Sequence, residues 1–127
     1  MKHNLLLTIV SLLSILLMSL HITDDIIRGL SPPGADNVGA VVIFVVWLLG
    51  TLLLSERPLG HVIMLLGGLF AAAMPVLHMR GKSYIAIATS GGGFFFVWTL
   101  IAVGVIGTFS VILAARGLWM LRSSPPR

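Results

Sequence analysis

The chain has 127 residues, of which 57% are hydrophobic and only 9% charged, and its mean hydropathy of +1.09 lies outside the range of soluble domains. It contains no cysteine, which excludes thiol oxidases, disulfide reductases and metal sites made of thiolates. We attribute the net charge of +4 and the pI of about 10.8 to membrane topology, and we expect no nucleic-acid partner.

The charged residues divide the chain into four uncharged stretches, each long enough to cross a bilayer. About 20 residues of helix cross roughly 30 Å of hydrocarbon, and such segments seldom carry charge. We therefore predict an all-α, polytopic integral membrane protein, a single membrane domain over residues 1–127 with four transmembrane helices in an up-down bundle. The predicted helices cover approximately 4–28, 37–55, 59–79 and 92–121, with outer loops at 29–36 and 80–91, an inner turn at 56–58 and a disordered tail at 123–127.

The distribution of charge between the two sides of the membrane predicts the orientation. If each stretch crosses once, the side that holds both termini carries five basic residues and one acidic residue, which is the whole net charge of +4. The opposite side has equal numbers of acidic and basic residues. The positive-inside rule therefore predicts that both termini are cytoplasmic, and we expect the plasma (inner) membrane.

The first predicted helix has one polar face, on which Asn4, Thr8, Ser11 and Ser14 fall at helical spacing. In lipid, such a face turns toward other helices, where hydroxyl groups bond across the contact or back to carbonyls of their own helix. We favour this packing role over the alternative, in which the face lines a path for a solute.

Small residues predict where the helices approach each other closely. The third helix has two small-x-x-x-small pairs, and the last helix has a second face of small residues that we expect to meet the third helix or another copy of the chain. We expect the third helix at the centre of the bundle. The small residues concerned are Gly67, Gly68, Ala71, Ala72, Gly104 and Gly107.

Aromatic residues mark the ends of the last helix. Trp98 and Trp119 are predicted to anchor it at the two levels of the lipid headgroups. The loop before this helix, around residues 84–88, fits either a helical turn or a short strand, and the sequence does not decide between them.

One group of residues has the chemistry of a binding site. The first and third helices run in the same direction, so His21 and His78 reach the same end of the bundle, and Asp25 lies one turn after His21. Two imidazoles and a carboxylate suit zinc or copper, and two histidines on different helices suit a haem. The alternative, which we favour from the sequence, is that the histidines lie at the membrane interface without a ligand, while Asp24 pairs with Arg28.

Three classes of function remain open. No acidic or basic residue lies in the middle of a predicted helix, where coupled transporters usually hold one. We therefore favour a non-catalytic membrane component, without a cofactor, that associates with itself or with a larger membrane-protein partner. The alternatives are a small channel or transporter formed by oligomerisation, and a metal- or haem-binding redox protein that uses His21 and His78.

Overall fold

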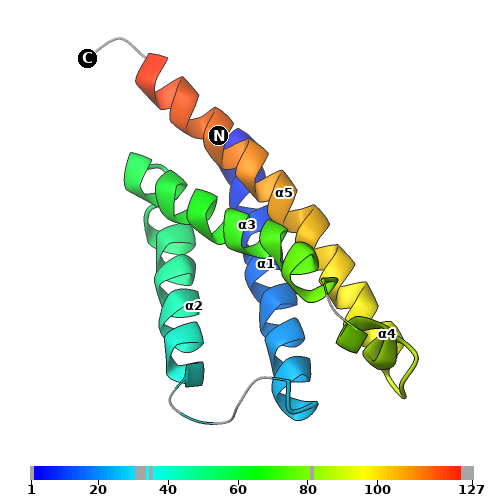
Figure 1. Ribbon diagram of the computed structural model, residues 1–127. Helices are drawn as coiled ribbons and strands as arrows, with labels where there is room; N and C mark the ends of the chain where they lie inside the picture. Colours follow the sequence, from blue (N-terminus) through cyan, green and yellow to red (C-terminus); the bar gives the residue numbers. More distant parts are fainter. Residues whose placement is uncertain (1, 31–33, 35, 81, 124–127) are drawn as a thin grey trace.

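The computed structural model describes residues 2–30, 34, 36–80 and 82–123, and 88% of these residues are helical, with no strand among them. This confirms the all-α class. The elements are α1 (Lys2–Ile27), α2 (Asp36–Leu53), α3 (Pro58–His78), α4 (Lys82–Ala88) and α5 (Gly93–Ser123), shown in Figure 1. The tail that we predicted at 123–127 begins inside α5, and its other residues lie outside the described ranges.

Three helices are long and apolar enough to cross a membrane: His3–Ile27, Pro58–His78 and Gly93–Ser123. α2 is also apolar, but the segment Asn37–Leu53 is shorter than these three. α2 ends at Leu53, two residues before the predicted end at residue 55. The chain turns directly after it, and the N–H of Arg57 donates to the carbonyl of Leu54 at 2.9 Å. The structure thus supports a membrane protein with three candidate spans.

The segment between α3 and α5, which the sequence left open, forms the short helix α4. Its chain then turns at Gly92, whose φ of +77° favours glycine, and α5 begins at the next residue. Gly93 lies so close to the carbonyls of Ile87 and Ala88 that an added Cβ would be 2.4 Å from each. α4 is therefore folded back against the start of α5.

Small residues form the contact between α3 and α5, the most extensive contact in the bundle. A Cβ on Gly107 would lie 2.6 Å from the backbone nitrogen of Ala72, and one on Gly104 would lie 2.4 Å from the ring of Pro75. A Cβ on Gly68 would lie 3.1 Å from the carbonyl oxygen of Gly107. The small faces of the two helices thus meet within one chain, whereas Gly67 instead receives the Trp47 ring of α2.

The centre of the bundle is shared by α3 and α5, because α5 also packs along α1 while α2 packs mainly against α3. At one end of the bundle, the Nε2 of His3, near the start of α1, lies 3.0 Å from the carbonyl oxygen of Leu113 in the second half of α5. At the same end His61, near the start of α3, lies against Gly117. α1 and α3 therefore run in one direction and α5 in the other, as Figure 1 shows.

Candidate metal centre

α1 ends in a hydrogen-bonded glycine motif that fixes its last turns. Gly29 has a φ of +70°, its N–H donates to the carbonyl of Ile26 at 3.0 Å, and the N–H of Leu30 donates to that of Asp25 at 2.9 Å. This pattern closes the helix with its last carbonyls bonded. The predicted pair of Asp24 with Arg28 is confirmed, with Nε to Oδ2 at 2.7 Å.

On the inner side of the same turns, the structure brings together the three residues that the sequence suggested as metal ligands. The Oδ2 of Asp25 lies 3.0 Å from the Nε2 of His78 on α3 and 3.9 Å from the Nε2 of His21 on its own helix. One possible ligand atom from each of the three residues falls within 4.8 Å of the others. The two imidazole rings are edge to face, with centroids 5.0 Å apart.

The second ring nitrogen of His21 is held by a threonine that the sequence did not single out. Its Nδ1 lies 3.1 Å from the Oγ1 of Thr99 on α5. That hydroxyl has one hydrogen, which it donates to the carbonyls of Phe95 and Phe96 at 2.9 and 3.1 Å. If the hydroxyl keeps this hydrogen on its own helix, its oxygen accepts from His21, which corresponds to the neutral imidazole with its proton on Nδ1.

His78 is arranged in the same way. Its Nδ1 lies 3.2 Å from the main-chain carbonyl of Met74, which can only accept, so this nitrogen also carries a proton. In the neutral ring, the Nε2 then has a lone pair directed at the carboxylate of Asp25. The 3.0 Å contact between these two atoms thus needs either a proton or a cation between them.

Two buried polar atoms of the cluster have no hydrogen-bond partner among the described residues. They are the Nε2 of His21 and the Oδ1 of Asp25, and the His21 side chain is completely buried. A buried polar atom without a partner costs about 1–3 kcal/mol, so such atoms are rare. A cation between the two histidines and the carboxylate would satisfy both atoms.

Aromatic and loop residues enclose the cluster. The ring of Phe96 lies 5.1 Å from that of His21 and 6.1 Å from that of His78, and Tyr84 of α4 packs on Phe96 at 6.5 Å. Arg28 binds the turn between α4 and α5 through the carbonyl of Gly92 at 2.9 Å. The His78 side chain keeps 24% of its surface exposed, so the cluster is open on that side.

The polar face of α1 lies away from this cluster, and two of its four members are fully buried. Ser11 is fully buried, accepts from the Nε1 of Trp47 at 2.9 Å and bonds the hydroxyl of Thr51 at 2.8 Å. Thr51 in turn donates to the carbonyl of Trp47 at 2.8 Å. Ser14 is also buried and donates to Val10 of its own helix, and the two remaining members, Asn4 and Thr8, are half-buried.

The predicted anchors of α5 are both exposed, Trp98 to 50% and Trp119 to 75%. They are separated by 21 positions, which corresponds to roughly 30 Å along a helix and thus to the thickness of the hydrocarbon core.

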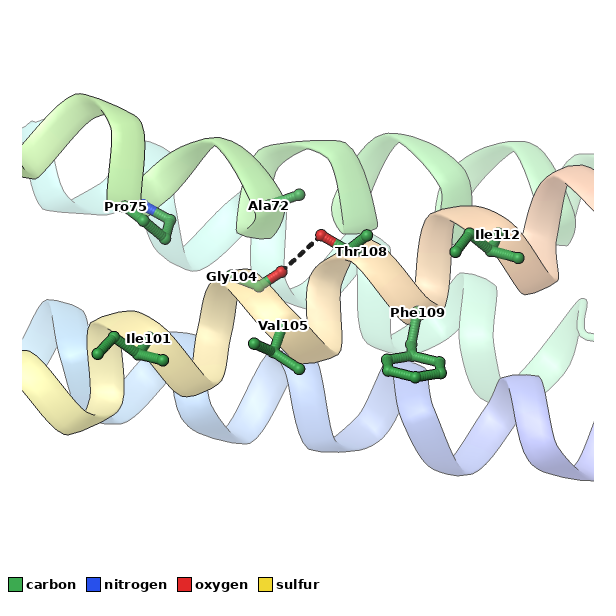
Figure 2. A pocket seen from close by; sticks show the side chains of 8 residues that line it. All are labelled: Ala72, Pro75, Ile101, Gly104, Val105, Thr108, Phe109 and Ile112. Atoms are coloured by element: carbon green, nitrogen blue, oxygen red, sulfur yellow. Dashed lines mark hydrogen bonds between the residues drawn. The ribbon is translucent and has the colours of Figure 1, made fainter.

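A groove of about 410 Å³ runs on the outside of the α3–α5 contact, between Pro75 and Ala72 on one side and the Ile101–Ile112 face of α5 on the other (Figure 2). The hydroxyl of Thr108 donates to the carbonyl of Gly104 at 2.8 Å, as the dashed line shows. The groove is lined chiefly by apolar side chains and adds no reactive group to the cluster.

The chain matches no known protein family, and neither a curated protein nor a solved structure is significantly similar to it. The arrangement of its own residues therefore carries the functional argument.

Proposed function

We propose that this chain is an integral membrane protein that binds one divalent transition-metal ion through the Nε2 of His21, the carboxylate of Asp25 and the Nε2 of His78. The observation that carries this proposal is the convergence of the three ligand atoms within 4.8 Å, together with the unpartnered Nε2 of the fully buried His21. The other ring nitrogen of a metal-bound histidine usually donates its hydrogen to an oxygen, and the Nδ1 atoms of both histidines here lie 3.1 and 3.2 Å from an oxygen.

The donor set favours zinc or a neighbouring metal that accepts imidazole, and the absence of cysteine leaves no thiolate for softer sites. Bonds of about 2.0–2.1 Å in a tetrahedral site place the ligand atoms roughly 3.3 Å apart. The distances of 3.0 and 3.9 Å from Asp25 to the two histidines lie on either side of this value. Three protein ligands leave a fourth position for water, on the side where His78 is exposed.

A single ion fits this cluster better than a haem. Two histidines that bind one haem lie on opposite faces of the porphyrin, with the iron between them. The rings of His21 and His78 touch edge to face at 5.0 Å and both turn toward Asp25, which leaves no plane for a porphyrin.

The ion acts in this proposal as a link between helices in a non-catalytic membrane component. α1 and α3 contact each other less than either contacts α5, and the cluster joins their ends. An ion that binds only the folded state at 100 times its Kd adds about 2.7 kcal/mol of stability. Association with further copies or with a larger partner remains a prediction.

Metal binding can be measured on the detergent-purified protein after chelator treatment. We expect one equivalent of Zn²⁺ by elemental analysis, and a Co²⁺ complex with visible absorption bands. His21→Ala, His78→Ala and Asp25→Asn should each weaken binding by more than the roughly 10–100-fold typical of residues that only support a ligand. His3→Ala removes a histidine at the other end of the bundle and should leave the affinity unchanged. A wild-type protein that binds no Zn²⁺, or a His21→Ala variant with unchanged affinity, refutes the proposal.

We also propose that α2 is a fourth span and that both termini are cytoplasmic in the plasma (inner) membrane. The supporting observations are the 18 apolar-rich residues of α2, close to the lower limit for a span, and the excess of basic residues on the side of the termini. Since the chain has no cysteine, Thr89→Cys should react with an impermeant thiol reagent in intact cells, and Ser123→Cys only after lysis. Labelling of Ser123→Cys in intact cells would overturn this orientation.

A further inference from the structure

We infer that Thr99 is a positioning residue of the metal site, which fixes the tautomer and the orientation of His21 before any ion arrives. This inference rests on the proposed metal-binding function. It concerns a residue on α5, a helix that supplies none of the three ligands.

The direction of the hydrogen bonds carries the inference. Thr99 lies fully buried at the first turns of α5, and its single hydroxyl hydrogen is taken by the carbonyls of Phe95 and Phe96. With this hydrogen on its own helix, the hydroxyl accepts at His21, and the Nδ1 of His21 donates. The lone pair of His21 is thereby assigned to Nε2, the nitrogen that faces Asp25 at 3.9 Å.

Without this acceptor, His21 would have a better alternative. The Nε2–H tautomer could donate to the carboxylate of Asp25, whose Oδ1 has no partner among the described residues. That tautomer has no lone pair at the position of the ion and cannot bind it until the proton moves. Thr99 thus keeps the lone pair of the His21 Nε2 available for the metal ion, as supporting residues do in other metal sites.

The orientation of the ring depends on the same contact. The ring centroid of His21 lies 5.1 Å from that of Phe96 on α5 and 5.0 Å from that of His78 on α3. The His21 ring is therefore held between neighbours on these two helices. The bond from Nδ1 to Thr99 at 3.1 Å sets which edge faces the carboxylate. α5 therefore contributes to the site by aligning a ligand of α1.

The test compares Thr99→Val, which keeps the shape but lacks the hydroxyl, with Thr99→Ser, which keeps it. Thr108→Val is the matched control, because Thr108 makes the same kind of bond to its own helix but lies on the groove. We expect Thr99→Val to weaken Zn²⁺ binding about 10–100-fold, and Thr99→Ser and Thr108→Val to stay close to wild type.

A second measurement needs no metal. Long-range ¹H–¹⁵N correlation spectra of the metal-free protein distinguish the two neutral tautomers of a histidine, and we expect the Nδ1–H form for His21 in the wild type and its loss in Thr99→Val. An Nε2–H form in the wild type, or an unchanged Zn²⁺ affinity of Thr99→Val, overturns the role of Thr99. A wild-type protein that binds no Zn²⁺ refutes the proposed function instead, and the tautomer of His21 still tests Thr99.

Discussion

Replacing Gly107 with alanine should destabilise the bundle by about 0.5–2 kcal/mol, although alanine favours helix more than glycine does. The added Cβ would lie 2.6 Å from the backbone nitrogen of Ala72, 2.7 Å from the Cβ of Ala71 and 2.9 Å from its carbonyl carbon. Non-bonded carbon atoms prefer a separation of about 3.5–4.0 Å. Neither a backbone atom nor a Cβ can move away from the new Cβ by rotating about a side-chain bond. α3 and α5 must therefore move apart by nearly 1 Å, which is roughly the difference between these distances and the preferred separation of 3.5 Å.

The magnitude follows from two opposing terms. Overpacking of a close contact costs typically about 1–3 kcal/mol. Alanine recovers about 0.5–1 kcal/mol relative to glycine within a helix. The overpacking term is the larger, because the separation also weakens the neighbouring contacts of Gly68 and Gly104 along the same pair of helices.

Gly39→Ala provides the matched control. Gly39 lies in α2, and an added Cβ meets nothing within 4 Å, so only the gain in helix propensity remains, about 0.5–1 kcal/mol of stabilisation. Reversible unfolding in mixed micelles of a mild detergent and dodecyl sulfate, followed by circular dichroism, gives the free energy of unfolding of both variants. If Gly107→Ala is stabilised as much as Gly39→Ala, the close approach of α3 and α5 described above is wrong.

Two further predictions use the same bundle. Ser11→Ala leaves the buried indole N–H of Trp47 without its acceptor and should cost about 1–3 kcal/mol in the unfolding assay. Ser14→Ala, whose hydroxyl only returns to its own helix, should have the smaller effect, and equal effects would contradict the network. Arg28→Gln should speed amide hydrogen exchange in the turn between α4 and α5, because the bonds from the guanidinium to that turn are lost. Arg80→Gln removes another basic side chain as a control, and equal exchange in both variants would argue against a role of Arg28 in holding this turn.

The four long helices could be predicted from the sequence, because long uncharged and apolar stretches of a chain form helices in lipid. The length of α2 could not be predicted, because its end depends on the tight turn that follows Leu54. This turn also requires Gly60, where a Cβ would overlap the carbonyl of Leu54. α4 was ambiguous because residues 82–88 are too few for a periodic pattern to separate a helical turn from a strand.

The three members of the cluster were identified in advance because helical spacing places Asp25 one turn after His21, and equal depth places His78 beside them. Thr99 was missed for a physical reason. A threonine near the start of an apolar helix ordinarily returns its hydroxyl to its own backbone, and Thr99 does so as well. Its second role depends on the rotation of α5 relative to α1, which no pattern within α5 encodes.

The separation of the cluster along the chain has a consequence for biogenesis. α1 carries His21 and Asp25 into the membrane first, and each then depends on a residue made later: His78 follows Asp25 by 53 positions, and Thr99 follows His21 by 78. Until α3 and α5 have been inserted, α1 has a buried imidazole and a carboxylate with no polar neighbour from another helix. A chain that ends after α2 thus holds two of the three ligand residues and neither His78 nor Thr99, so the complete site can form only after the first turns of α5 have been made.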